Sequence, residues 1–271
     1  MFDKEEKLGG TWNKVVRIGD TVHRRDRGGL ALHSYLLYLE KAGMEGVPRF
    51  LGLDQQGREI LSYLPGKTQE RDLLPGNKKN GHPWLRSDET IAGIASFMRR
   101  LHDVSAGFLP EALERGWINP DDPRVDTICH NDAAVWNFVF SEDGRISGLF
   151  DFDQARAGTR LWDLAWSVYG IAHLMPWEYD PALDAYVDYD HPKHAAGRKR
   201  RIKLYFDSYG MDCPPDFMEL VYRRVQIGVC DALERDAAAG DKTAKRQIKK
   251  GGLAHYRKVA AHIRECGQDW M

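Results

Sequence analysis

The sequence predicts an α+β protein in which a small β-rich part precedes a larger, mainly helical part. Short runs rich in β-branched and aromatic residues, separated by turn residues, fill most of the stretch before residue 66 and are typical of strands. From residue 87 onward, apolar residues recur at helical spacing. Strands followed by helices favour the α+β class. We therefore expect two domains, 1–65 and 66–271.

The composition is that of a globular chain and argues against several other classes. The 271 residues are 42% hydrophobic, and 39 basic residues nearly balance 40 acidic ones, which disfavours both a disordered chain and a nucleic-acid binder. No run reaches the roughly 18 apolar residues that span a membrane, and the N-terminus lacks a secretory pattern. We expect a cytoplasmic protein without nucleic-acid or membrane partners. The four cysteines form no C-x-x-C pair and are expected to be buried free thiols.

The first part is expected to contain two hairpins with a helix between them. The first hairpin turns at Gly19-Asp20, and the second turns within 54–57. Apolar positions at helical spacing predict a helix over 32–41. Residues 67–86 are polar and rich in Gly, Pro, Asn and Lys, which is typical of a loop.

The second part is expected to begin with a helix capped by Ser87, since Asp88 and Glu89 then lie in its first turn. Helical periodicity continues further along the chain. Four later helices are predicted, at 161–174, 197–209, 215–234 and 243–265.

The most informative segment reads H-x-D-x-x-x-x-N, with His130, Asp132 and Asn137 at its defined positions. A hairpin with an Asp-Gly turn follows and ends at Asp151. This spacing is that of the kinase catalytic loop, in which Asp accepts the proton of the attacking hydroxyl and Asn binds magnesium. Carboxylate and amide oxygens are ligands that Mg²⁺ prefers. We expect Asp132 to orient a hydroxyl, and Asn137 and Asp151 to hold the metal.

A histidine and an aspartate two residues apart are weak evidence alone, because such residues often satisfy buried backbone groups in turns. The added asparagine and the hairpin running into Asp151-Phe152-Asp153 make the pattern much narrower. Asp153 is either a second metal ligand or a hydrogen-bonded turn residue, and the turn is the favoured interpretation.

On these motifs the chain resembles the aminoglycoside phosphotransferase family, whose protein-kinase-like fold also serves choline and homoserine kinases. The family's catalytic-loop pattern falls on His130, Asp132 and Asn137, and its metal-binding aspartate falls on Asp151. Its later aspartate, in a D-L-A context at a helix start, falls on Asp163.

The resemblance covers roughly residues 8–170 and implies a two-lobed fold with a β-rich nucleotide-binding lobe. It implies transfer of the ATP γ-phosphoryl group to a small-molecule hydroxyl, with Mg²⁺ as cofactor. GTP in place of ATP, the acceptor and the oligomeric state stay open. The resemblance also implies that adenine lies between the lobes, against backbone near Ser62, Tyr63 and Leu64.

Kinase-like folds place a strand lysine against the nucleotide phosphates, but strand 21–25 carries Arg24 and Arg25 instead. Arg24 is the candidate, because it shares a face with Val22 by strand alternation and because arginine binds phosphate well. Arg25 is the alternate, and a solvated surface arginine is the other interpretation. The helix acid expected to pair with the strand cation has no clear equivalent, since His33 stands near its place.

Two further features have open interpretations, and three residues are assigned to supporting or core positions. Gly9-Gly10-Thr11 is a short phosphate-covering loop or an ordinary turn. Asp163 caps the following helix, orients the catalytic loop, or does both. His102 is expected to be a satisfied core or supporting histidine, and Trp162 and Trp166 are expected in the core.

An acidic stretch suggests the acceptor. Between Trp177 and His191 the chain carries five acidic residues and no Lys or Arg. If the stretch is helical, Asp180, Asp184 and Asp188 share one face and repel one another. A cationic acceptor such as an aminoglycoside or an amino alcohol would supply the missing charge. The alternatives are neutralisation by the basic run at 198–203 or a solvated loop.

Two other functional classes stay open. A metal-dependent phosphohydrolase would use the same Asp and Asn ligands with water as acceptor. A catalytically silent nucleotide-binding protein is the other, because the strand lysine is missing.

Overall fold

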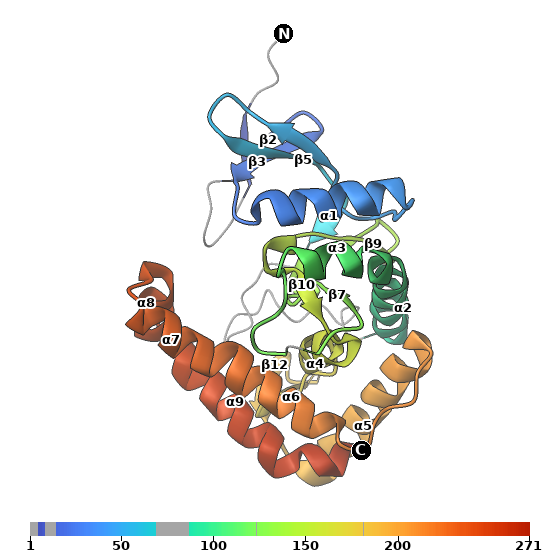
Figure 1. Cartoon of the computed structure of the whole chain (residues 1–271). Coiled ribbons are helices and arrows are strands. Elements are labelled where there is room, and N and C mark those ends of the chain that lie inside the picture. The colour runs from blue at the N-terminus through green and yellow to red at the C-terminus, as the bar shows by residue number, and fades with distance from the viewer. Residues whose placement is uncertain (1–4, 9–14, 69–86, 123, 181) are drawn as a thin grey trace.

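A computed structural model describes residues 5–8, 15–68, 87–122, 124–180 and 182–271. A small sheet with one helix across it lies at one end of the molecule, and a larger, mainly helical part lies beneath it (Figure 1). The predicted α+β class is confirmed.

The small sheet is antiparallel, in the order β1-β2-β3-β5-β4. Both predicted hairpins are present, and α1 (Gly29–Lys41) confirms the predicted helix between them. Leu32, Leu36 and Leu39 of α1 are buried, as their spacing predicts. The strands are β1 (Glu6–Leu8), β2 (Val15–Ile18), β3 (Thr21–Arg25), β4 (Phe50–Leu53) and β5 (Arg58–Ser62).

Short strands frame the motif segment in the larger part. β7 (Thr127–Cys129) pairs with β10 (Arg156–Gly158). β8 (Phe138–Phe140) pairs with both β9 (Ile146–Leu149) and β6 (Lys67–Thr68). The start of the predicted 67–86 loop is therefore a strand, and the remainder of that loop lies outside the described residues.

Helices form most of the larger part. α2 (Asp88–Ser105) begins as predicted, because the Ser87 hydroxyl accepts a hydrogen bond from the Thr90 N–H over 3.2 Å. Its apolar stripe is buried. The other helices are α3 (Leu109–Glu114), α4 (Arg160–Ile171), α5 (His191–Tyr209), α6 (Phe217–Val225), α7 (Ala232–Ala238), α8 (Lys242–Lys249) and α9 (Gly252–Cys266). Single-turn 3-10 helices lie at Ala106–Phe108, Val135–Asn137, Phe152–Gln154 and Gly267–Trp270.

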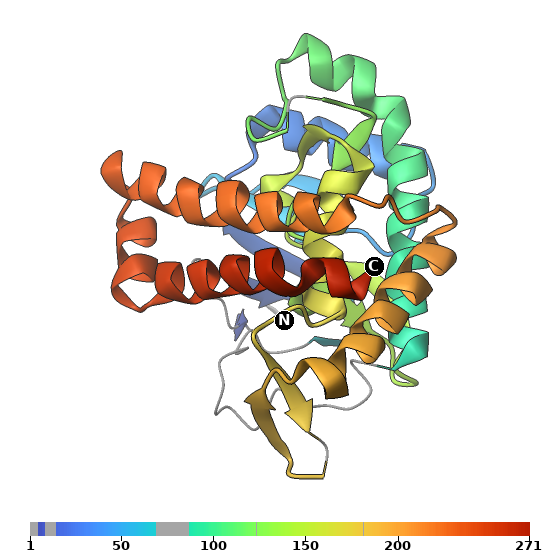
Figure 2. The same ribbon diagram turned by 90° about the horizontal axis from the view of Figure 1, so that it is seen from below.

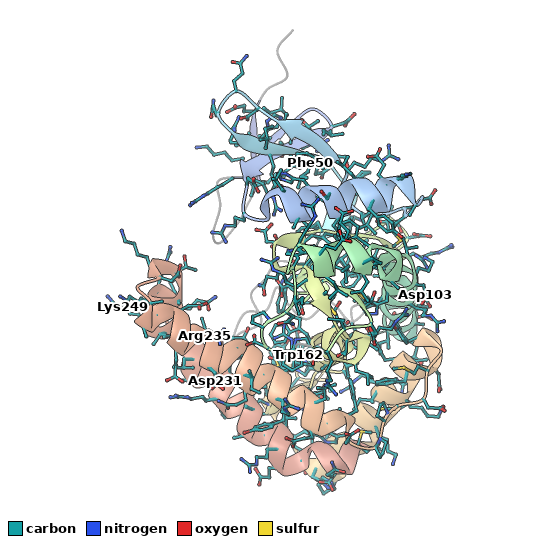
Figure 3. The ribbon with its side chains drawn as sticks, in the orientation of Figure 1. Phe50, Asp103, Trp162, Asp231, Arg235 and Lys249 are labelled. Atoms are coloured by element: carbon teal, nitrogen blue, oxygen red, sulfur yellow. The ribbon has the colours of Figure 1, made fainter. Side chains whose placement is uncertain are left out.

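Two predicted helices are divided. A π-helical turn, Gln226–Asp231, joins α6 to α7. The predicted 243–265 helix is two helices, because Gly251 adopts a φ of +85° that ends the helical path between α8 and α9. In Figure 3, Asp231, Arg235 and Lys249 follow one another along the π turn, α7 and α8, whereas Trp162 lies in the middle of the larger part.

Residues 177–188 form a hairpin, so the helical interpretation of the acidic stretch is wrong. β11 (Trp177–Asp180) pairs with β12 (Ala185–Asp188) in antiparallel register, and the hairpin projects below the helices (Figure 2). Alternating aromatic and polar residues favour a strand, and Asp184 takes the positive φ of +47° in the turn. Asp180, Asp184 and Asp188 therefore do not form a helical face.

The remaining sequence expectations concern burial. Trp162 and Trp166 are buried as predicted. All four cysteines are free, but only Cys129 and Cys230 are buried. Within the described ranges, every helix is too short or too polar to cross a membrane.

Candidate active site

The loop 130–137 brings the aspartate and the asparagine of the motif into direct contact. Asn137 donates from Nδ2 to the backbone oxygen of Asp132 over 2.8 Å and to its Oδ2 over 3.0 Å. Asp132 is 9% exposed, so few conformations other than this one are open to its carboxylate. The loop leaves β7 and is closed by the 3-10 turn that contains Asn137.

A second donor to Asp132 comes from a residue that the sequence predicted only as core. Trp166 of α4 donates from Nε1 to Oδ1 of Asp132 over 3.0 Å. Trp166 lies three residues after Asp163, so both point from one face of α4 toward the loop. That spacing is the sequence signal that could have identified Trp166.

Arg224 of α6 supports the same loop from the other side. Its Nη2 donates to the backbone oxygen of Asn131 over 2.6 Å, and its guanidinium lies 4.9 Å from the centre of the Trp166 ring. Burial lowers the pKa of Arg224. Gly228 in the π turn makes room, because a Cβ there would lie 2.2 Å from Nη1 of Arg224. No sequence pattern connects Arg224 with a loop 93 residues away.

His130 joins the loop 130–137 to the segment that follows β9 and leads to Asp151. Its Nδ1 accepts from the Asp132 N–H over 3.2 Å, and its Nε2 lies 3.0 Å from the backbone oxygen of Phe150. An accepting Nδ1 requires the proton on Nε2, which then donates to Phe150. Burial lowers the pKa of His130, in agreement with this neutral form. Through these two contacts His130 positions the loop backbone.

Asp163 orients the catalytic loop, which was one of the two predicted roles. Its Oδ2 accepts from the His130 N–H over 2.7 Å and lies 3.0 Å from Nε2 of His102; its Oδ1 accepts from the Asn131 N–H over 2.8 Å. Burial alone would raise the pKa of Asp163, but these donors hold it below its usual value. The capping role belongs to Thr159, whose hydroxyl accepts from the N–H of Trp162. His102 is a supporting histidine, as predicted.

Asn137 precedes β8 and Asp151 follows β9, so both residues lie at the open end of the β8–β9 hairpin. The Phe150 N–H donates to the backbone oxygen of Asn137 over 3.0 Å. Asp151 has the positive φ of +68°, and its side chain is 40% exposed. Because both N–H bonds of the Asn137 amide are used on Asp132, its carbonyl oxygen is the group left to face a ligand. One carboxylate and one amide oxygen fit Mg²⁺, which typically adds waters and substrate phosphates.

Arg24 is buried and holds carboxylates of both parts of the chain, so the solvated interpretation is wrong for it. Its Nη1 donates to Oδ1 of Asp151 over 2.9 Å, and its Nη2 donates to Asp153. Burial opposes the charge, but these carboxylates and Glu59 together raise the pKa of Arg24. Asp153 is thus an ion-pair partner of Arg24. The alternate, Arg25, is exposed.

The acidic partner of the strand cation comes from the neighbouring strand and not from the helix. Glu59 of β5 lies opposite Arg24 in register, and Oε1 of Glu59 is 2.7 Å from Nε of Arg24. Burial raises the pKa of Glu59 to about 7, although Arg24 opposes this shift. The sequence prediction placed this acid on the helix, and the strand register that brings Glu59 opposite Arg24 is the signal that identifies it.

The predicted adenine-binding segment uses two of its backbone donors internally. The N–H of Ser62 donates to the Arg49 oxygen and that of Tyr63 donates to the Asp20 oxygen, over 2.9 and 2.8 Å. Of the three predicted residues, Leu64 is then the one to supply a backbone donor. Gly9-Gly10-Thr11 lies outside the described residues.

Part of the chain matches the sequence model of a known protein family, and one curated protein is similar over most of its length. Residues 109–202 match the sequence model of the phosphotransferase enzyme family. That range contains His130, Asp132, Asn137, Asp151 and Asp163. The trifolitoxin immunity protein of Rhizobium leguminosarum bv. trifolii is 29% identical over 222 residues, which cover 78% of this chain and 76% of that protein.

Solved structures share the fold at low identity. The GDP complex of aminoglycoside 2'-phosphotransferase-IIIa aligns with a TM-score of 0.57 at 14% identity, over 98% of this chain and 94% of that one. A choline/ethanolamine kinase family protein from Mesorhizobium loti aligns with a TM-score of 0.53 at 18% identity, over 97% and 92%. The resemblance to the aminoglycoside phosphotransferase family is confirmed. The two-lobed, protein-kinase-like fold is confirmed with it.

A third alignment includes a complex with an acceptor. The aminoglycoside phosphotransferase APH(3'')-Id of Streptomyces rimosus, solved with ADP and streptomycin, aligns with a TM-score of 0.51 at 12% identity. The alignment covers 81% of this chain and 91% of that one.

In this structure, much of the acidic stretch is neutralised. Glu178 is buried and lies 3.4 Å from Arg198 and 3.1 Å from Arg201. Asp180 pairs with Lys193 over 2.8 Å. Arg198 and Arg201 belong to the basic run at 198–203, and Lys193 precedes it by a few residues. The prediction that basic residues near this run neutralise the acidic stretch therefore holds for Glu178 and Asp180.

Proposed function

We propose that this protein is a small-molecule kinase that transfers the γ-phosphoryl group of ATP or GTP to a hydroxyl group. The observation that carries the proposal is the Asp132 carboxylate, fixed between Trp166 and Asn137. Asn137 in turn is hydrogen-bonded through its backbone to Phe150, the residue before the partly exposed Asp151. Asn137 and Asp151 add an amide oxygen and a carboxylate that can bind Mg²⁺. A fixed carboxylate and a metal site suit phosphoryl transfer, in which positioning and charge stabilisation provide most of the catalysis.

Asp132 accepts the proton of the acceptor hydroxyl in this proposal. Its carboxylate oxygens accept hydrogen bonds from Asn137 and Trp166, and because one carboxylate oxygen can accept more than one hydrogen bond, it can also accept from a substrate hydroxyl. Asp163, His130 and Arg224 keep the loop backbone in place. Because these contacts exist before substrate binds, little reorganisation is required during the reaction.

Asn137 and Asp151 would hold Mg²⁺ through the amide oxygen and the carboxylate. When bound, the ion neutralises charge that develops on the transferred phosphoryl group. Arg24 already donates to Asp151 and, in this proposal, exchanges that carboxylate for a phosphate oxygen when nucleotide enters, as guanidinium binds both groups well.

The segment 1–65 is proposed as the nucleotide-binding lobe and 66–271 as the lobe with the catalytic loop and the acceptor site. Adenine would lie near Ser62, Tyr63 and Leu64, with the Leu64 backbone as donor. β5 of the small sheet ends at Ser62, and β6, which begins at Lys67, pairs with β8 of the larger part; the segment therefore connects the two parts, which supports this choice.

The acceptor is proposed to be a small molecule with a hydroxyl group, and a cationic one is tested first. Proteins with this fold include aminoglycoside phosphotransferases and a choline/ethanolamine kinase family protein. Glu178 and Asp180 are already paired with basic side chains, which weakens the electrostatic argument for a cationic acceptor. The panel of acceptors to be tested therefore also includes neutral molecules. Trifolitoxin is included in the panel because the similar protein of Rhizobium leguminosarum bv. trifolii is named for immunity to this toxin.

The test measures nucleoside diphosphate and phosphorylated product together. Purified protein is incubated with Mg²⁺, with ATP or GTP, and with each member of the acceptor panel. A kinase forms diphosphate and product in equal amounts, with one acceptor far above the rest. Diphosphate and free phosphate without product would identify a phosphohydrolase. Thermal stabilisation by Mg²⁺-nucleotide without turnover on any acceptor would identify a silent nucleotide-binding protein.

A further inference from the structure

A cluster of three potential metal ligands lies in the small part, apart from the catalytic loop. Asp26 follows β3, His33 is on α1, and Glu59 is on β5. Nε2 of His33 lies 3.5 Å from Oδ1 of Asp26 and 3.6 Å from Oε2 of Glu59. One ligand atom from each of the three residues lies within 4.8 Å of the others.

The polar atoms that face one another in this cluster have unusual surroundings. The side chains of His33 and Glu59 are 8% and 0% exposed. Within the described part of the chain, Nε2 of His33 and both carboxylate oxygens of Glu59 complete no hydrogen bond. Buried polar groups nearly always have a partner, and each exception requires an explanation.

Ion pairing explains only part of this arrangement. Nε of Arg24 lies 2.7 Å from Oε1 of Glu59, but its other nitrogens serve Asp151 and Asp153, and Oε2 faces His33. A charged His33 would pair with both carboxylates, yet burial lowers its pKa against the influence of Asp26. A neutral N–H at 3.5 and 3.6 Å from its acceptors is beyond ordinary hydrogen-bond length.

We propose that Asp26, His33 and Glu59 bind a divalent transition-metal ion of the zinc type. In tetrahedral zinc sites the bonds to nitrogen and oxygen are about 2.0–2.2 Å, which separates the ligand atoms by roughly 3.4 Å. The two distances from His33 match that separation. Imidazole nitrogen favours such metals over Mg²⁺ or Ca²⁺, which prefer all-oxygen sites.

The surroundings of the cluster suit a bound ion. The His33 ring is stacked on Phe50, with ring centres 3.9 Å apart and an angle of 11°, which fixes its orientation; Phe50 lies where the sheet faces α1 (Figure 3). Asp26 is 29% exposed, so its side is open for entry and for a water as fourth ligand. The Oδ1 of Asp26 also accepts from the Gly29 N–H over 2.9 Å, which holds this ligand in place.

The charges around Arg24 also favour a cation here. Three carboxylates, those of Glu59, Asp151 and Asp153, act on this guanidinium, and Asp26 and Asp153 both act on Glu59. Mutual repulsion among them is reduced by a dication at Asp26 and Glu59. The ion would connect the loop after β3, helix α1 and strand β5, and so hold the strand that presents Arg24. The proposal does not depend on the phosphotransferase activity.

The experiment titrates Co²⁺ into the full-length protein without nucleotide or Mg²⁺ and follows visible d–d absorption, with Zn²⁺ as competitor and the thermal midpoint as second readout. Wild type is expected to develop the absorption band, to lose it to Zn²⁺ and to gain thermal stability with either ion. Asp26→Asn and His33→Gln are expected to weaken Co²⁺ binding more than about 100-fold, since even outer-sphere partners change affinity about 10–100-fold.

Two controls separate this site from other sources of binding. His23→Gln removes the histidine of a comparable pair in the same sheet, in which Nδ1 lies 3.1 Å from Asp54, and is expected to bind Co²⁺ normally. Asp151→Ala is expected to bind normally as well. Absence of the band and of stabilisation in wild type overturns the proposal. Binding that survives both Asp26→Asn and His33→Gln, or that disappears in Asp151→Ala, also overturns it. Asp26→Asn changes a partly exposed side chain, so a folded variant is available even if His33→Gln is unstable.

Discussion

The indole nitrogen of Trp166 lies 3.0 Å from Oδ1 of Asp132 and donates to it, while the Asn137 amide donates to the other carboxylate oxygen. The two donors come from different elements, helix α4 and the turn that ends the loop. Indole can only donate, so Oδ1 accepts from Trp166 while Oδ2 accepts from Asn137, and the two contacts together fix the rotation of the carboxylate. The orientation of the proposed base is therefore set by the protein before substrate binds.

Trp166→Phe is expected to lower kcat about 10-fold, within the range of one lost hydrogen bond of about 1–1.5 kcal/mol. Phenylalanine keeps the ring that faces Arg224 but removes the N–H. Because a hydrogen bond to the ionised carboxylate favours that form, the acidic limb of the kcat–pH profile moves to higher pH. Steady-state kinetics with the acceptor found in the panel measure both effects.

Trp162→Phe is the matched control, since Trp162 is on the same helix and its ring also lies near Arg224, at 5.4 Å. It is expected to leave the acidic limb in place. If both variants move the limb equally, the indole of Trp166 acts by packing alone.

Asp132→Asn is expected to reduce turnover about 10²–10⁴-fold, or about 3–5 kcal/mol of barrier. The amide cannot take the hydroxyl proton, and its NH₂ group would meet a donor, either Trp166 or Asn137. Nucleotide affinity should stay unchanged because Asp132 has no proposed contact with nucleotide. Asp143→Asn, in the exposed turn of the β8–β9 hairpin, serves as control. Wild-type turnover in Asp132→Asn would remove this residue from the mechanism.

Asp151→Ala is expected to abolish the Mg²⁺ dependence of nucleotide binding, because Asp151 is the proposed charged ligand of the metal. Arg24 would lose one of its partners but keep Glu59 and Asp153. Calorimetric titration of ATP and GTP with and without Mg²⁺ compares the variant with wild type. Asp188→Ala, on the exposed hairpin, should behave as wild type. Coincident Mg²⁺ titrations of wild type and Asp151→Ala would show that the metal assignment is wrong.

Local patterns in the sequence were sufficient for the parts of the fold that depend on local interactions. The Ser87 cap, the buried stripe of α2 and the two hairpins of the small sheet follow from capping, periodicity and turn residues. The motif residues were also found, because their chemistry requires a fixed spacing along one loop. Their proposed roles stay predictions.

The contacts that were missed join residues far apart in the sequence. Glu59 meets Arg24 through strand register, and Arg224 reaches Asn131 from a helix near the end of the chain. No spacing rule predicts such contacts. The spacing of the acidic residues alone is compatible with a helix at 180–188, whereas the alternation of Tyr179, Tyr186 and their neighbours favours the strands that form there.

His262 on α9 gives a prediction for stability against pH. Its Nε2 accepts from Nη1 of the buried Arg198 over 2.8 Å, so the imidazole is neutral there. Burial, together with the charges of Arg198 and Lys258, lowers the pKa of His262 to about 4. Because the unfolded chain binds the proton near 6.5, its stabilising contribution is complete above that pH and is lost as the pH falls toward 4. The loss amounts to about 2–3 kcal/mol.

His262→Gln keeps an acceptor for Arg198 but does not titrate, so its free energy of unfolding should fall less on acidification. Urea unfolding at pH 7.5 and pH 4.5 measures the difference between wild type and variant. The variant must be compared with wild type at each pH because a second group also titrates in this range. The pKa of Glu59 is raised to about 7, so its protonation stabilises the folded state as the pH falls, in opposition to His262. His191→Gln changes a histidine that is 54% exposed and should keep the wild-type dependence. Equal losses of stability in wild type and His262→Gln would show that protonation at Arg198 does not limit acid stability.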